Sequence, residues 1–507
     1  MFERLKNRKI PVVMGTQHPD NAGAPFFQDD PFIASTKEAE EVFLGFSQLG
    51  LDEFMWDWEG KFADEALIEK LLSSHHDYFK QKGMGRDVFV TLRVPNIWEE
   101  KSFKLARAYM GVLSAAEFAK SYDLPAPPVL EFILPMTKSA DQLLHVQKTF
   151  QKTAQLHQEI FKESDFGQGY IQMIPLFESV EDLSHIEQVL HPYLDEHQAH
   201  FGFLPSPFRV FIARSDPALN AGLIPAVLAS RLALRQTHLT ALQYGIEIAP
   251  IIGTGALPFR GGINPENIEQ SLAQYKGART LTVQSAFRYD YPREDVERAL
   301  ATIRETLNKN EHVEFPENEV VILKKWIERG QILYRETIEK MAPLINEIAR
   351  EIPRRRERVQ HVGLFGYNRG VGEVTLPRVI TFTAALYSLG IPPEFIATGR
   401  LLAEMESAGE LELIERHFFT LRHELSHAGK FLNRENLEWL KADQTWARDY
   451  ETDVQNIERI FKTEIGPKKP HHFLHRNLSS NIFLKWRQGE SAKDDVAAAA
   501  VARKSLG

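Results

Sequence analysis

The sequence predicts a (βα)8 barrel elaborated by a largely α-helical C-terminal region, and three observations predict it. Eight short apolar runs bounded by turn residues lie between residues 11 and 285, and their starts are 33 to 42 residues apart. The segments between them show the apolar spacing of helices, as a (βα)8 barrel requires. From about residue 316 the pattern changes to long helices. A doubly wound open sheet is the alternative, because the number of strands alone does not exclude it.

The predicted strands are continuous apolar runs, which is typical of parallel strands buried on both faces. They are Pro11–Gly15, Leu51–Trp56, Val88–Val94, Val129–Pro135, Ile171–Phe177, Phe208–Ala213, Glu247–Gly253 and Thr280–Ser285. Helices are predicted between them, for example over Thr36–Gln48, Asp64–Gln81 and Ala140–Phe161. We therefore expect residues 1–315 to form the barrel core.

Residues 316–507 are predicted to form a helical region that packs on the barrel as part of one structural unit. Its main helices are expected over Glu317–Arg350, Pro377–Leu389, Pro393–Ser407 and Arg434–Phe461. Almost no strand pattern occurs in this part of the chain. The run Arg354-Arg355-Arg356 is interpreted as a solvated helix end or linker.

The composition excludes several classes of function. The formal net charge of -9 over 507 residues gives no basic surface of the kind that binds nucleic acid. The chain has no cysteine, which excludes disulfides, iron–sulfur clusters and thiolate zinc sites. The N-terminal residues lack the apolar segment of a signal peptide, and no stretch approaches 18 uninterrupted apolar residues. We expect a cytoplasmic enzyme with no membrane or nucleic-acid partner.

Polar side chains follow the predicted strands, at the end of a barrel where active sites lie. They are Gln17, His18, Pro19 and Asp20 after the first strand, Asp57 and Glu59 after the second, Arg93 at the end of the third, and Glu178, Asp216, Arg260, Gln284 and Arg288 after the fifth to eighth. A single charged residue after a strand is usually only solvated. Their coincidence on one face suits a metal ion and an anionic substrate.

A second candidate anion site lies in the Gly-rich segment G-L-F-G-Y-N-R-G-V-G-E-V-T-L-P-R, residues 363–378. Its loop carries Arg369, and Pro377 at a helix start would place Arg378 in the first helical turn. A helix N-terminus with an arginine is suited to phosphate or carboxylate. The alternative is that these arginines pair with surface acids.

Several of these segments, in this order, resemble the phosphoenolpyruvate carboxylase family, specifically its short archaeal type. T-Q-H-P-D-N at 16–21 resembles the family's N-terminal histidine motif, and L-F-E-S-V-E-D-L (176–183) and S-D-P-A-L-N-A-G (215–222) resemble its metal-carboxylate segments. F-R-G-G at 259–262 is similar to the end of its Gly-rich mobile loop. The resemblance continues through L-P-R-V-I-T-F at 376–382 to residue 507.

The resemblance implies conversion of phosphoenolpyruvate and bicarbonate to oxaloacetate and phosphate, with Mg²⁺ or Mn²⁺ as cofactor. It implies that Glu178 and Asp216 ligate the metal, and oxygen ligation suits Mg²⁺. His18 would take the proton of carboxyphosphate and so release CO2 beside the enolate of pyruvate, because an imidazole has a pKa near working pH. Members of the family are typically homotetramers.

The resemblance also assigns the remaining polar groups of the rim. Arginines stabilise the charge that spreads over phosphoryl oxygens, and this role falls to Arg260 and Arg369. Arg93, Arg378 and Gln284 are assigned to substrate binding. The longer enzymes carry a histidine and a further arginine in the mobile loop, where this chain has Ile252 and Thr254.

Two other enzyme classes are consistent with parts of the sequence. Another barrel lyase or mutase acting on phosphoenolpyruvate or 2-oxo acids would use the same Glu/Asp pair, but it would not need His18 and the downstream arginines. His423-Glu424-Leu425-Ser426-His427 fits the H-E-x-x-H helix of zinc metalloproteases, with Glu451 as a possible third ligand. The extended protease motif fails, because residues 430 and 433 are Lys and Asn.

Overall fold

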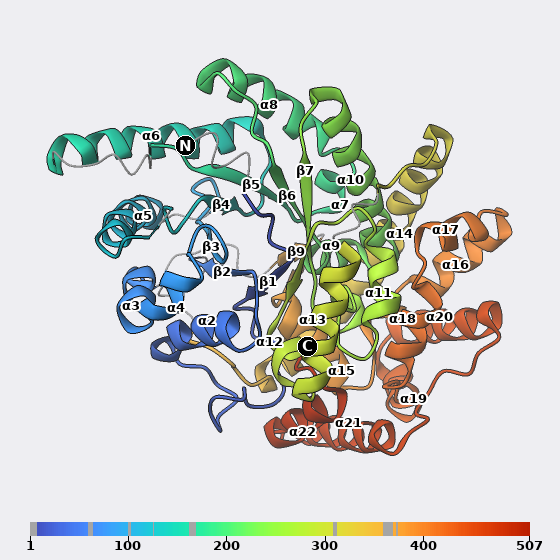
Figure 1. Cartoon of the computed structure of the whole chain (residues 1–507). Coiled ribbons are helices and arrows are strands. Elements are labelled where there is room, and N and C mark those ends of the chain that lie inside the picture. The colour runs from blue at the N-terminus through green and yellow to red at the C-terminus, as the bar shows by residue number, and fades with distance from the viewer. Residues whose placement is uncertain are drawn as a thin grey trace.

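The computed structural model is a closed barrel of eight parallel strands with the strands in chain order (Figure 1). It describes residues 8–58, 64–99, 103–124, 126–161, 169–307, 312–357, 369–371 and 374–507, with no side-chain description for 369–371. The first strand pairs with both the second and the eighth, so the sheet closes. The predicted (βα)8 barrel is confirmed, and the open sheet is excluded.

The strands of the barrel coincide with the predicted ones to within two residues at each end. They are β1 (Val13–Thr16), β2 (Glu53–Asp57), β3 (Phe89–Arg93), β4 (Glu131–Leu134), β5 (Gln172–Phe177), β6 (Phe208–Ala213), β7 (Ile248–Gly253) and β8 (Thr280–Val283). The helices between them are α2 (Glu38–Ser47), α3 (Leu67–Ser74), α4 (His76–Gln81), α5 (Lys104–Ser121), α6 (Ala140–Phe161), α7 (Val180–Leu183), α8 (Glu187–Phe201), α9 (Ser215–Ala221), α10 (Leu223–Tyr244), α11 (Ile268–Gln274), α12 (Ser285–Tyr289) and α13 (Arg293–Leu307).

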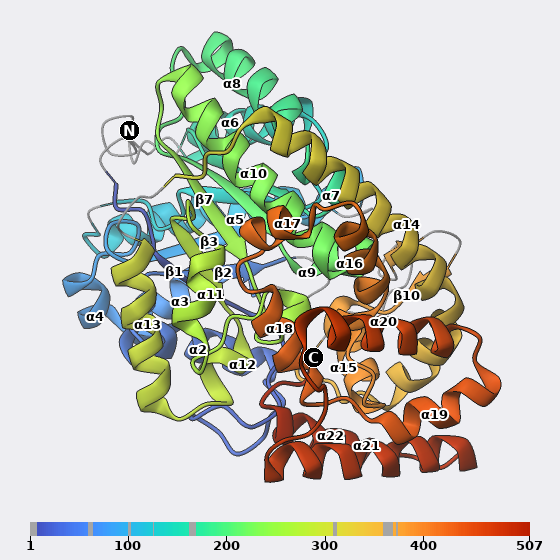
Figure 2. The ribbon, with the colours of Figure 1, turned by 90° about the vertical axis from the view of Figure 1, so that its right-hand side faces the viewer.

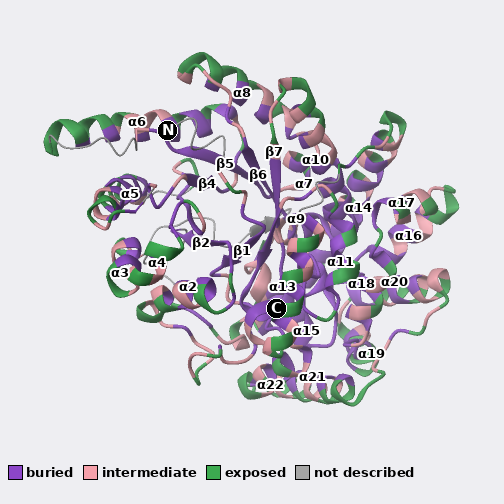
Figure 3. Ribbon diagram, viewed as in Figure 1, coloured by how far each residue is buried: buried purple, intermediate pink, exposed green. Residues whose placement is uncertain are grey.

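Side chains alternate between the two faces of the barrel wall because successive residues of a strand point to opposite faces. The interior holds an apolar cluster made of Met14, Met55, Ile133, Ile174, Leu176, Phe211, Ala213 and Ile251. Their outward-facing neighbours, such as Phe54 and Ile212, pack in the larger core under the helices. Figure 3 shows the strands buried, with exposed residues on the outer helices. The alternation fixes which side chains reach the barrel's interior.

A charged cluster fills the interior at the amino ends of the strands. Arg209 Nη1 and Nη2 donate to Glu53 Oε1 and Oε2 at 2.8 and 2.7 Å, and Nη1 donates to Glu131 Oε2 at 2.8 Å. Arg209 and Glu53 are fully buried, and Glu131 is nearly so. The bidentate pairing compensates for the loss of hydration. This cluster lies at the opposite end from the candidate site, so we assign it to structure.

Helices dominate the C-terminal region, as predicted. They are α14 (Glu317–Ile348), α15 (Val379–Ser388), α16 (Thr398–Ser407), α17 (Leu411–His417), α18 (Leu421–Gly429), α19 (Arg434–Asp443), α20 (Trp446–Phe461), α21 (Pro470–Gln488) and α22 (Lys493–Arg503). The long α14 packs against α9 and α10 of the barrel. Helices α15 to α22 gather on one side of the barrel, which Figure 2 shows in orange and red.

Four local features of this region differ from the expectation. The predicted helix Pro393–Ser407 is divided into the 3-10 helix η4 (Pro393–Phe395) and α16, because Ala397 between them takes a left-handed conformation. Residues Arg369–Val371 (β9) and Val374–Leu376 (β10) form an antiparallel pair, where almost no strand was expected. The predicted helix Arg434–Phe461 is interrupted between α19 and α20, because Gln444 takes an extended conformation (φ -119°, ψ 113°). Arg378 is the N-cap of α15, with an extended backbone, rather than a residue of its first turn.

The run of three arginines is not the solvated linker that the sequence suggests. Arg354 is exposed, but Arg355 and Arg356 are buried. Arg356 donates to both oxygens of Glu41 at 2.7 Å and also to Glu38 Oε1 at 3.1 Å. Arg356 and Glu41 are 315 residues apart in the chain, so no local pattern could reveal the pair.

No single helix in the described residues has both the length and the apolar character to cross a membrane. One pair of segments, Val379–Ser388 and Pro393–Ser407, meets that test only when the two are taken together, and a bend of 97° separates them.

Candidate active site

The carboxyl ends of the strands bring most of the predicted site residues to one rim of the barrel. Asp57 and Arg93 are the last residues of β2 and β3, and they share the inward-facing register of the interior cluster. Glu178 and Gln284 follow β5 and β8 by one residue and continue the same alternation. Strand geometry alone therefore directs these four side chains toward the mouth of the barrel.

Glu178 is one of the two predicted metal ligands. Its carboxylate is buried at the mouth, and its Oε2 accepts a hydrogen bond from the backbone N–H of Met136 at 2.8 Å. Met136 lies in the loop after β4, so neighbouring strands orient the carboxylate. A carboxylate fixed in this way is suited to ligation of a hard cation.

Asp216, the other predicted ligand, lies in the first turn of α9 and is half-buried. The elements that pack against the helix carrying it include the 3-10 helix η2 (Pro258–Arg260), the strand β9 and the helix α15. These elements carry or adjoin Arg260, Arg369 and Arg378. Helix α9 thus brings the backbone of the three predicted arginines to the side of the barrel on which Asp216 lies.

Arg260 is fully buried and makes a tight set of contacts. Its Nη1 donates to Asp20 Oδ2 at 3.1 Å and to the carbonyl oxygen of Gly507 at 2.5 Å, and its Nη2 donates to Gln284 Oε1. Burial lowers the pKa of the Arg260 guanidinium, while the carboxylates of Asp20 and Asp216 act in the opposite direction. Two predicted site residues, Arg260 and Gln284, are therefore in direct contact.

The Gly-rich loop after β7 closes tightly over Arg260. A Cβ on Gly255 would lie 2.7 Å from Arg260 Cζ, so a side chain there would displace the guanidinium. The backbone N–H of Gly255 donates to the carbonyl oxygen of Arg260 at 2.7 Å. Ile252 faces the outer core, and Thr254 bonds to Thr282 through both its N–H and its hydroxyl. Hence neither residue substitutes for the histidine and arginine of the longer enzymes.

Asp20, which belongs to the first polar segment, is central in the structure. It is fully buried, and besides Arg260 it accepts a hydrogen bond from the backbone N–H of Ala286 at 2.8 Å. It therefore links the segment after β1 to the segments after β7 and β8. The sequence signal for this role was its place in T-Q-H-P-D-N.

Arg93 forms a bidentate ion pair with Asp57. Arg93 Nε and Nη2 donate to Asp57 Oδ1 and Oδ2 at 2.9 and 2.6 Å. The backbone N–H of Asp57 in turn donates to Gln17 Oε1 at 3.0 Å. The planar fork of the guanidinium is thereby held in one orientation at the end of β3. Glu59, also expected near here, lies outside the described residues.

His18, the second residue of the first polar segment, is half-buried. Its Nδ1 lies 2.9 Å from the hydroxyl oxygen of Thr16. If Nδ1 carries the hydrogen and donates to that hydroxyl, Nε2 is left with its lone pair, which is the tautomer that a general base needs.

A buried network supports the segment that carries His18. Arg288 Nη2 donates to the carbonyl oxygen of Thr16 at 2.7 Å and to Glu41 Oε1 at 3.1 Å. Burial alone would raise the pKa of Glu41, but the guanidinium groups of Arg356 and Arg288 hold it at about 2. The sequence predicts Arg288 at the rim but contains no signal for Glu41 or Arg356.

Arg369 and Arg378 are the other two predicted arginines. Arg369 begins β9, but its side chain lies outside the described residues. Arg378 is half-buried at the start of α15. Their placement rests on the packing of β9 and α15 against α9.

The H-E-x-x-H segment falls on α18, as expected, but its geometry does not make a zinc site. The ring centroids of His423 and His427 lie 6.4 Å apart. Glu424 Oε1 accepts a hydrogen bond from the hydroxyl of Thr420. Glu451, the possible third ligand, accepts from Lys441 Nζ at 2.8 Å. Within the described ranges, no group of three or more His, Asp or Glu side chains is arranged to hold a metal ion.

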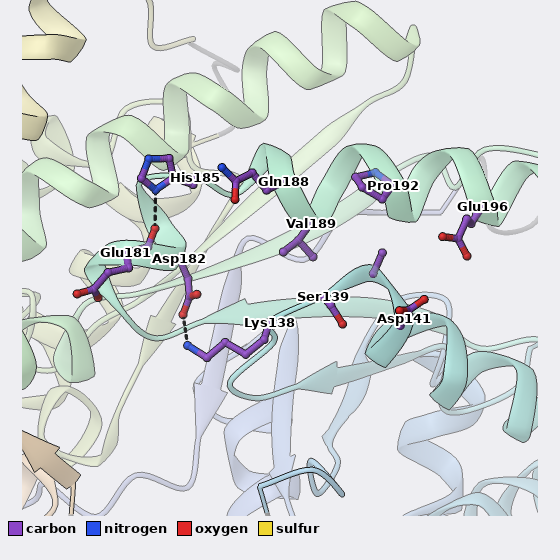
Figure 4. A pocket seen from close by; sticks show the side chains of 11 residues that line it. Lys138, Ser139, Asp141, Glu181, Asp182, His185, Gln188, Val189, Pro192 and Glu196 are labelled. Atoms are coloured by element: carbon purple, nitrogen blue, oxygen red, sulfur yellow. Dashed lines mark hydrogen bonds and ion pairs between the residues drawn. The ribbon is translucent and has the colours of Figure 1, made fainter.

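A polar groove of about 440 Å³ lies outside this rim, between α7, α8 and the start of α6 (Figure 4). Lys138 Nζ bonds to Asp182 Oδ2 across it, and His185 Nδ1 lies 3.1 Å from the carbonyl oxygen of Glu181. None of the predicted site residues that the structure describes is among its lining residues. We assign the chemistry to the rim and not to this groove.

Comparisons with known proteins show the family of the chain. A family model described as phosphoenolpyruvate carboxylase matches residues 10–507. The chain is 42% identical over 480 residues to a phosphoenolpyruvate carboxylase of Leuconostoc mesenteroides, covering 94% of this chain and 95% of that protein. It is 36% identical over 520 residues to a phosphoenolpyruvate carboxylase of Metallosphaera sedula, covering 99% and 100% of the two chains.

A solved structure of malate synthase from Haloferax volcanii aligns with 68% of this chain and 95% of its own at 11% identity. Its TM-score of 0.34 is too low to support an inference. The family match and the relatives, by contrast, extend over nearly the whole chain, including every segment of the rim. The chain belongs to the phosphoenolpyruvate carboxylase family.

Proposed function

We propose that this protein carboxylates phosphoenolpyruvate with bicarbonate and forms oxaloacetate and phosphate through carboxyphosphate and the enolate of pyruvate. Family membership supports the overall reaction. One observation carries the residue assignment: α9, which bears Asp216, packs against the elements that bear Arg260 and Arg369 and adjoin Arg378. An acidic metal site and cationic groups for a phosphate are what this chemistry requires side by side.

Enzymes of this family generally depend on a divalent metal ion. Glu178 and Asp216 fit such an ion, since both offer hard carboxylate oxygens and Glu178 is oriented by the N–H of Met136. We assign the site to Mg²⁺ or Mn²⁺. When bound, the ion supplies positive charge beside the substrate phosphate and the developing enolate oxygen.

The arginines would stabilise the negative charge of the phosphoryl group during its transfer to bicarbonate. In the present structure both terminal nitrogens of Arg260 are bonded to protein groups, including Gln284 and Gly507. Nε–H and one N–H of Nη2 take no part in these bonds, so they are the groups that remain to donate to a substrate. Arg93, held by Asp57, and Arg378 at the start of α15 are assigned to the phosphate or carboxylate of the substrate.

His18 would accept the proton of carboxyphosphate through Nε2, while Thr16 holds Nδ1. Loss of that proton releases CO2 and phosphate, and the enolate carbon then attacks CO2 to give oxaloacetate. The driving force comes from cleavage of the phosphate ester of phosphoenolpyruvate, so no ATP is needed.

The direct test is oxaloacetate formation coupled to malate dehydrogenase, with Mg²⁺ and with bicarbonate either present or omitted. Bicarbonate-dependent NADH oxidation with an equal release of phosphate is the expected result. Phosphate or pyruvate without oxaloacetate would instead favour a lyase or mutase that shares the Glu/Asp pair.

We also propose a homotetramer, on the basis of the family resemblance. Large apolar side chains on the C-terminal helices are exposed, among them Trp439, Leu474, Leu484 and Val501. The helices that carry them, α19, α21 and α22, pack next to one another, and a contiguous apolar patch is typical of an association surface. Sedimentation equilibrium of the purified protein gives the mass directly, and a monomer at micromolar concentration would contradict the proposal.

A further inference from the structure

Glu394 is a buried carboxyl group that no sequence motif marks. It lies in the 3-10 helix η4 (Pro393–Phe395) and is fully buried. Its Oε1 accepts two hydrogen bonds, one from the backbone N–H of Phe259 and one from the hydroxyl of Tyr387, both at 2.8 Å. Phe259 is the residue immediately before Arg260 in η2. The carboxyl group therefore holds the backbone on which Arg260 stands.

A second connection runs from Glu394 to the other end of the Arg260 side chain. The ring of Tyr387 lies 5.9 Å from the guanidinium carbon of Arg503, and Arg503 Nη2 donates to the carbonyl oxygen of Leu506 at 2.5 Å. The next residue, Gly507, provides the carbonyl oxygen that accepts from Arg260 Nη1. Glu394 is thus connected to Arg260 in two ways. One runs through the backbone of Phe259, the residue before Arg260, and the other through Gly507, whose carbonyl oxygen accepts from the Arg260 guanidinium.

The packing around Glu394 connects η4 to η2 without touching the metal carboxylates. Helix α18 packs against both η2 and η4, and Glu424 of α18 lies next to Gly262, with its Cγ and Cδ 3.9 Å from the position of a Cβ on that glycine. Arg260 is surrounded by the C-terminal region on this side and by Asp20 and Gln284 on the barrel side. A change at Glu394 should therefore act on Arg260 before it acts on Glu178 or Asp216.

We propose that Glu394 is a positioning residue for Arg260, coupling the helical C-terminal region to the binding of the substrate phosphate. The inference rests on the role proposed above for Arg260. It predicts that loss of the carboxyl group lowers kcat/KM for phosphoenolpyruvate. The Mg²⁺ concentration for half-maximal activity should not change.

The main test compares Glu394→Ala with Glu394→Gln. Alanine leaves the Phe259 N–H without its buried acceptor, and we expect kcat/KM for phosphoenolpyruvate to fall about 10-fold to 100-fold. Glutamine keeps an acceptor oxygen at the same place, so we expect its kcat/KM for phosphoenolpyruvate to lie within about threefold of the parent enzyme's value. The Mg²⁺ concentration for half-maximal activity should stay the same in both. A glutamine variant as impaired as the alanine variant would overturn the proposal.

A matched control separates positioning from general loss of stability. Asp453 is also a fully buried carboxylate in the helical region, and it accepts from the backbone N–H of Ala397 at 2.9 Å and from Arg400. It has no hydrogen bond to η2 in the described residues. Asp453→Asn should lower the melting temperature but leave KM for phosphoenolpyruvate unchanged; an equal rise in KM would overturn the proposal.

A double-mutant cycle tests the coupling itself. In an Arg260→Ala background, Glu394→Ala should cause no further loss of kcat/KM, because its effect passes through Arg260. Additive losses would overturn the proposal. If Glu394→Ala does not fold, Tyr387→Phe takes its place in the cycle: it removes one donor, and we expect about a threefold loss that vanishes in the Arg260→Ala background.

The two proposals fail in different ways. If Arg260→Ala leaves carboxylation unchanged, the role of Arg260 is wrong, and the inference falls with it. If Arg260→Ala impairs carboxylation but Glu394→Ala does not, only the role of Glu394 is wrong.

Discussion

In the proposed mechanism, His18 and Arg260 have different tasks at the scale of single residues. The imidazole is half-buried and contacts a hydroxyl, whereas the guanidinium is fully buried among a carboxylate, an amide and a carbonyl oxygen. An imidazole side chain can act as a general base. A guanidinium cannot, so it serves as a fixed positive charge.

His18→Asn should separate cleavage of phosphoenolpyruvate from carboxylation. The variant keeps the metal carboxylates and the arginines, so phosphate release in the presence of bicarbonate should continue. Without a base to deprotonate carboxyphosphate, CO2 is not delivered to the enolate, and pyruvate becomes the main product. Parallel coupling to lactate dehydrogenase and malate dehydrogenase measures both products. An output of oxaloacetate equal to that of the parent enzyme would remove His18 from the mechanism.

Glu178→Gln and Asp216→Asn test the metal site. Each replaces a carboxylate by a neutral carboxamide of the same size, so we expect at least about a 100-fold loss of activity and a higher Mg²⁺ requirement. Isothermal titration with Mn²⁺ provides a readout that does not depend on turnover. Glu181→Gln, at an exposed ion pair three residues away, is the matched control. Unchanged Mn²⁺ affinity in both ligand variants would contradict the assignment.

Glu424 offers a prediction for the pH dependence of stability. Burial raises the pKa of Glu424 from 4.5 to about 8, although Arg214 and Thr420 oppose this. Between pH 4.5 and 8 the unfolded chain has released a proton that the folded chain retains, so folding stability falls as pH rises. Glu424→Gln removes this dependence. Its melting temperature relative to the parent should rise from pH 5 to pH 8.5; a constant or falling difference would show that the carboxyl group is not buried in this way.

At the scale of elements, the buried ion pair between Arg356 and Glu41 determines how the segment after α14 packs against the barrel. Arg356 contacts Glu41 and Glu38 at the start of α2, and Arg288 of α12 shares Glu41. Three elements that are distant in the chain are thereby joined through one carboxylate. The same Arg288 supports the carbonyl oxygen of Thr16, next to the segment of His18.

Arg356→Ala should destabilise the fold strongly, and Arg354→Ala should not. Removing Arg356 leaves Glu41 buried without its main partner, which costs about 3–5 kcal/mol. Arg354 is exposed, and its removal should change the free energy of unfolding by no more than about 0.5 kcal/mol. Urea denaturation followed by circular dichroism measures both. Equal effects of the two substitutions would mean that the buried pair is not formed.

Most of the elements could be predicted because their patterns are local. The runs Ile171–Phe177 and Phe208–Ala213 are apolar enough to be identified as buried strands, and Ala140–Phe161 is a helix with the predicted bounds. The β9–β10 pair was missed because its segments have only three residues each. The break after α19 was missed because the helical pattern continues through Gln444.

At the scale of the whole molecule, the order of strands explains why the site could largely be predicted. A closed parallel barrel places the carboxyl ends of all strands on one rim, so Arg93, Glu178 and Gln284 could be assigned to it from sequence alone. Contacts between the barrel and the C-terminal region could not be predicted from the sequence. Glu394 meets Phe259 across 135 residues, and Arg260 meets Gly507 across 247.

The whole-molecule arrangement also explains why the H-E-x-x-H motif misleads. Its two histidines have the spacing of zinc ligands, but α18 packs against η2 and η4, which places Glu424 beside Gly262. The packing of the helix, which a local motif cannot encode, turns the carboxyl group toward the loop of Arg260.

The most direct test of the account follows oxygen atoms from bicarbonate into phosphate. If bicarbonate attacks the phosphoryl group and carboxyphosphate then breaks its C–O bond, one oxygen of bicarbonate must appear in each phosphate released. With bicarbonate labelled by 18O and the reaction quenched early, mass spectrometry should find one labelled oxygen per phosphate, formed together with oxaloacetate. Phosphate without label, or with label from water only, would contradict phosphorylation of bicarbonate and with it the proposed use of this rim.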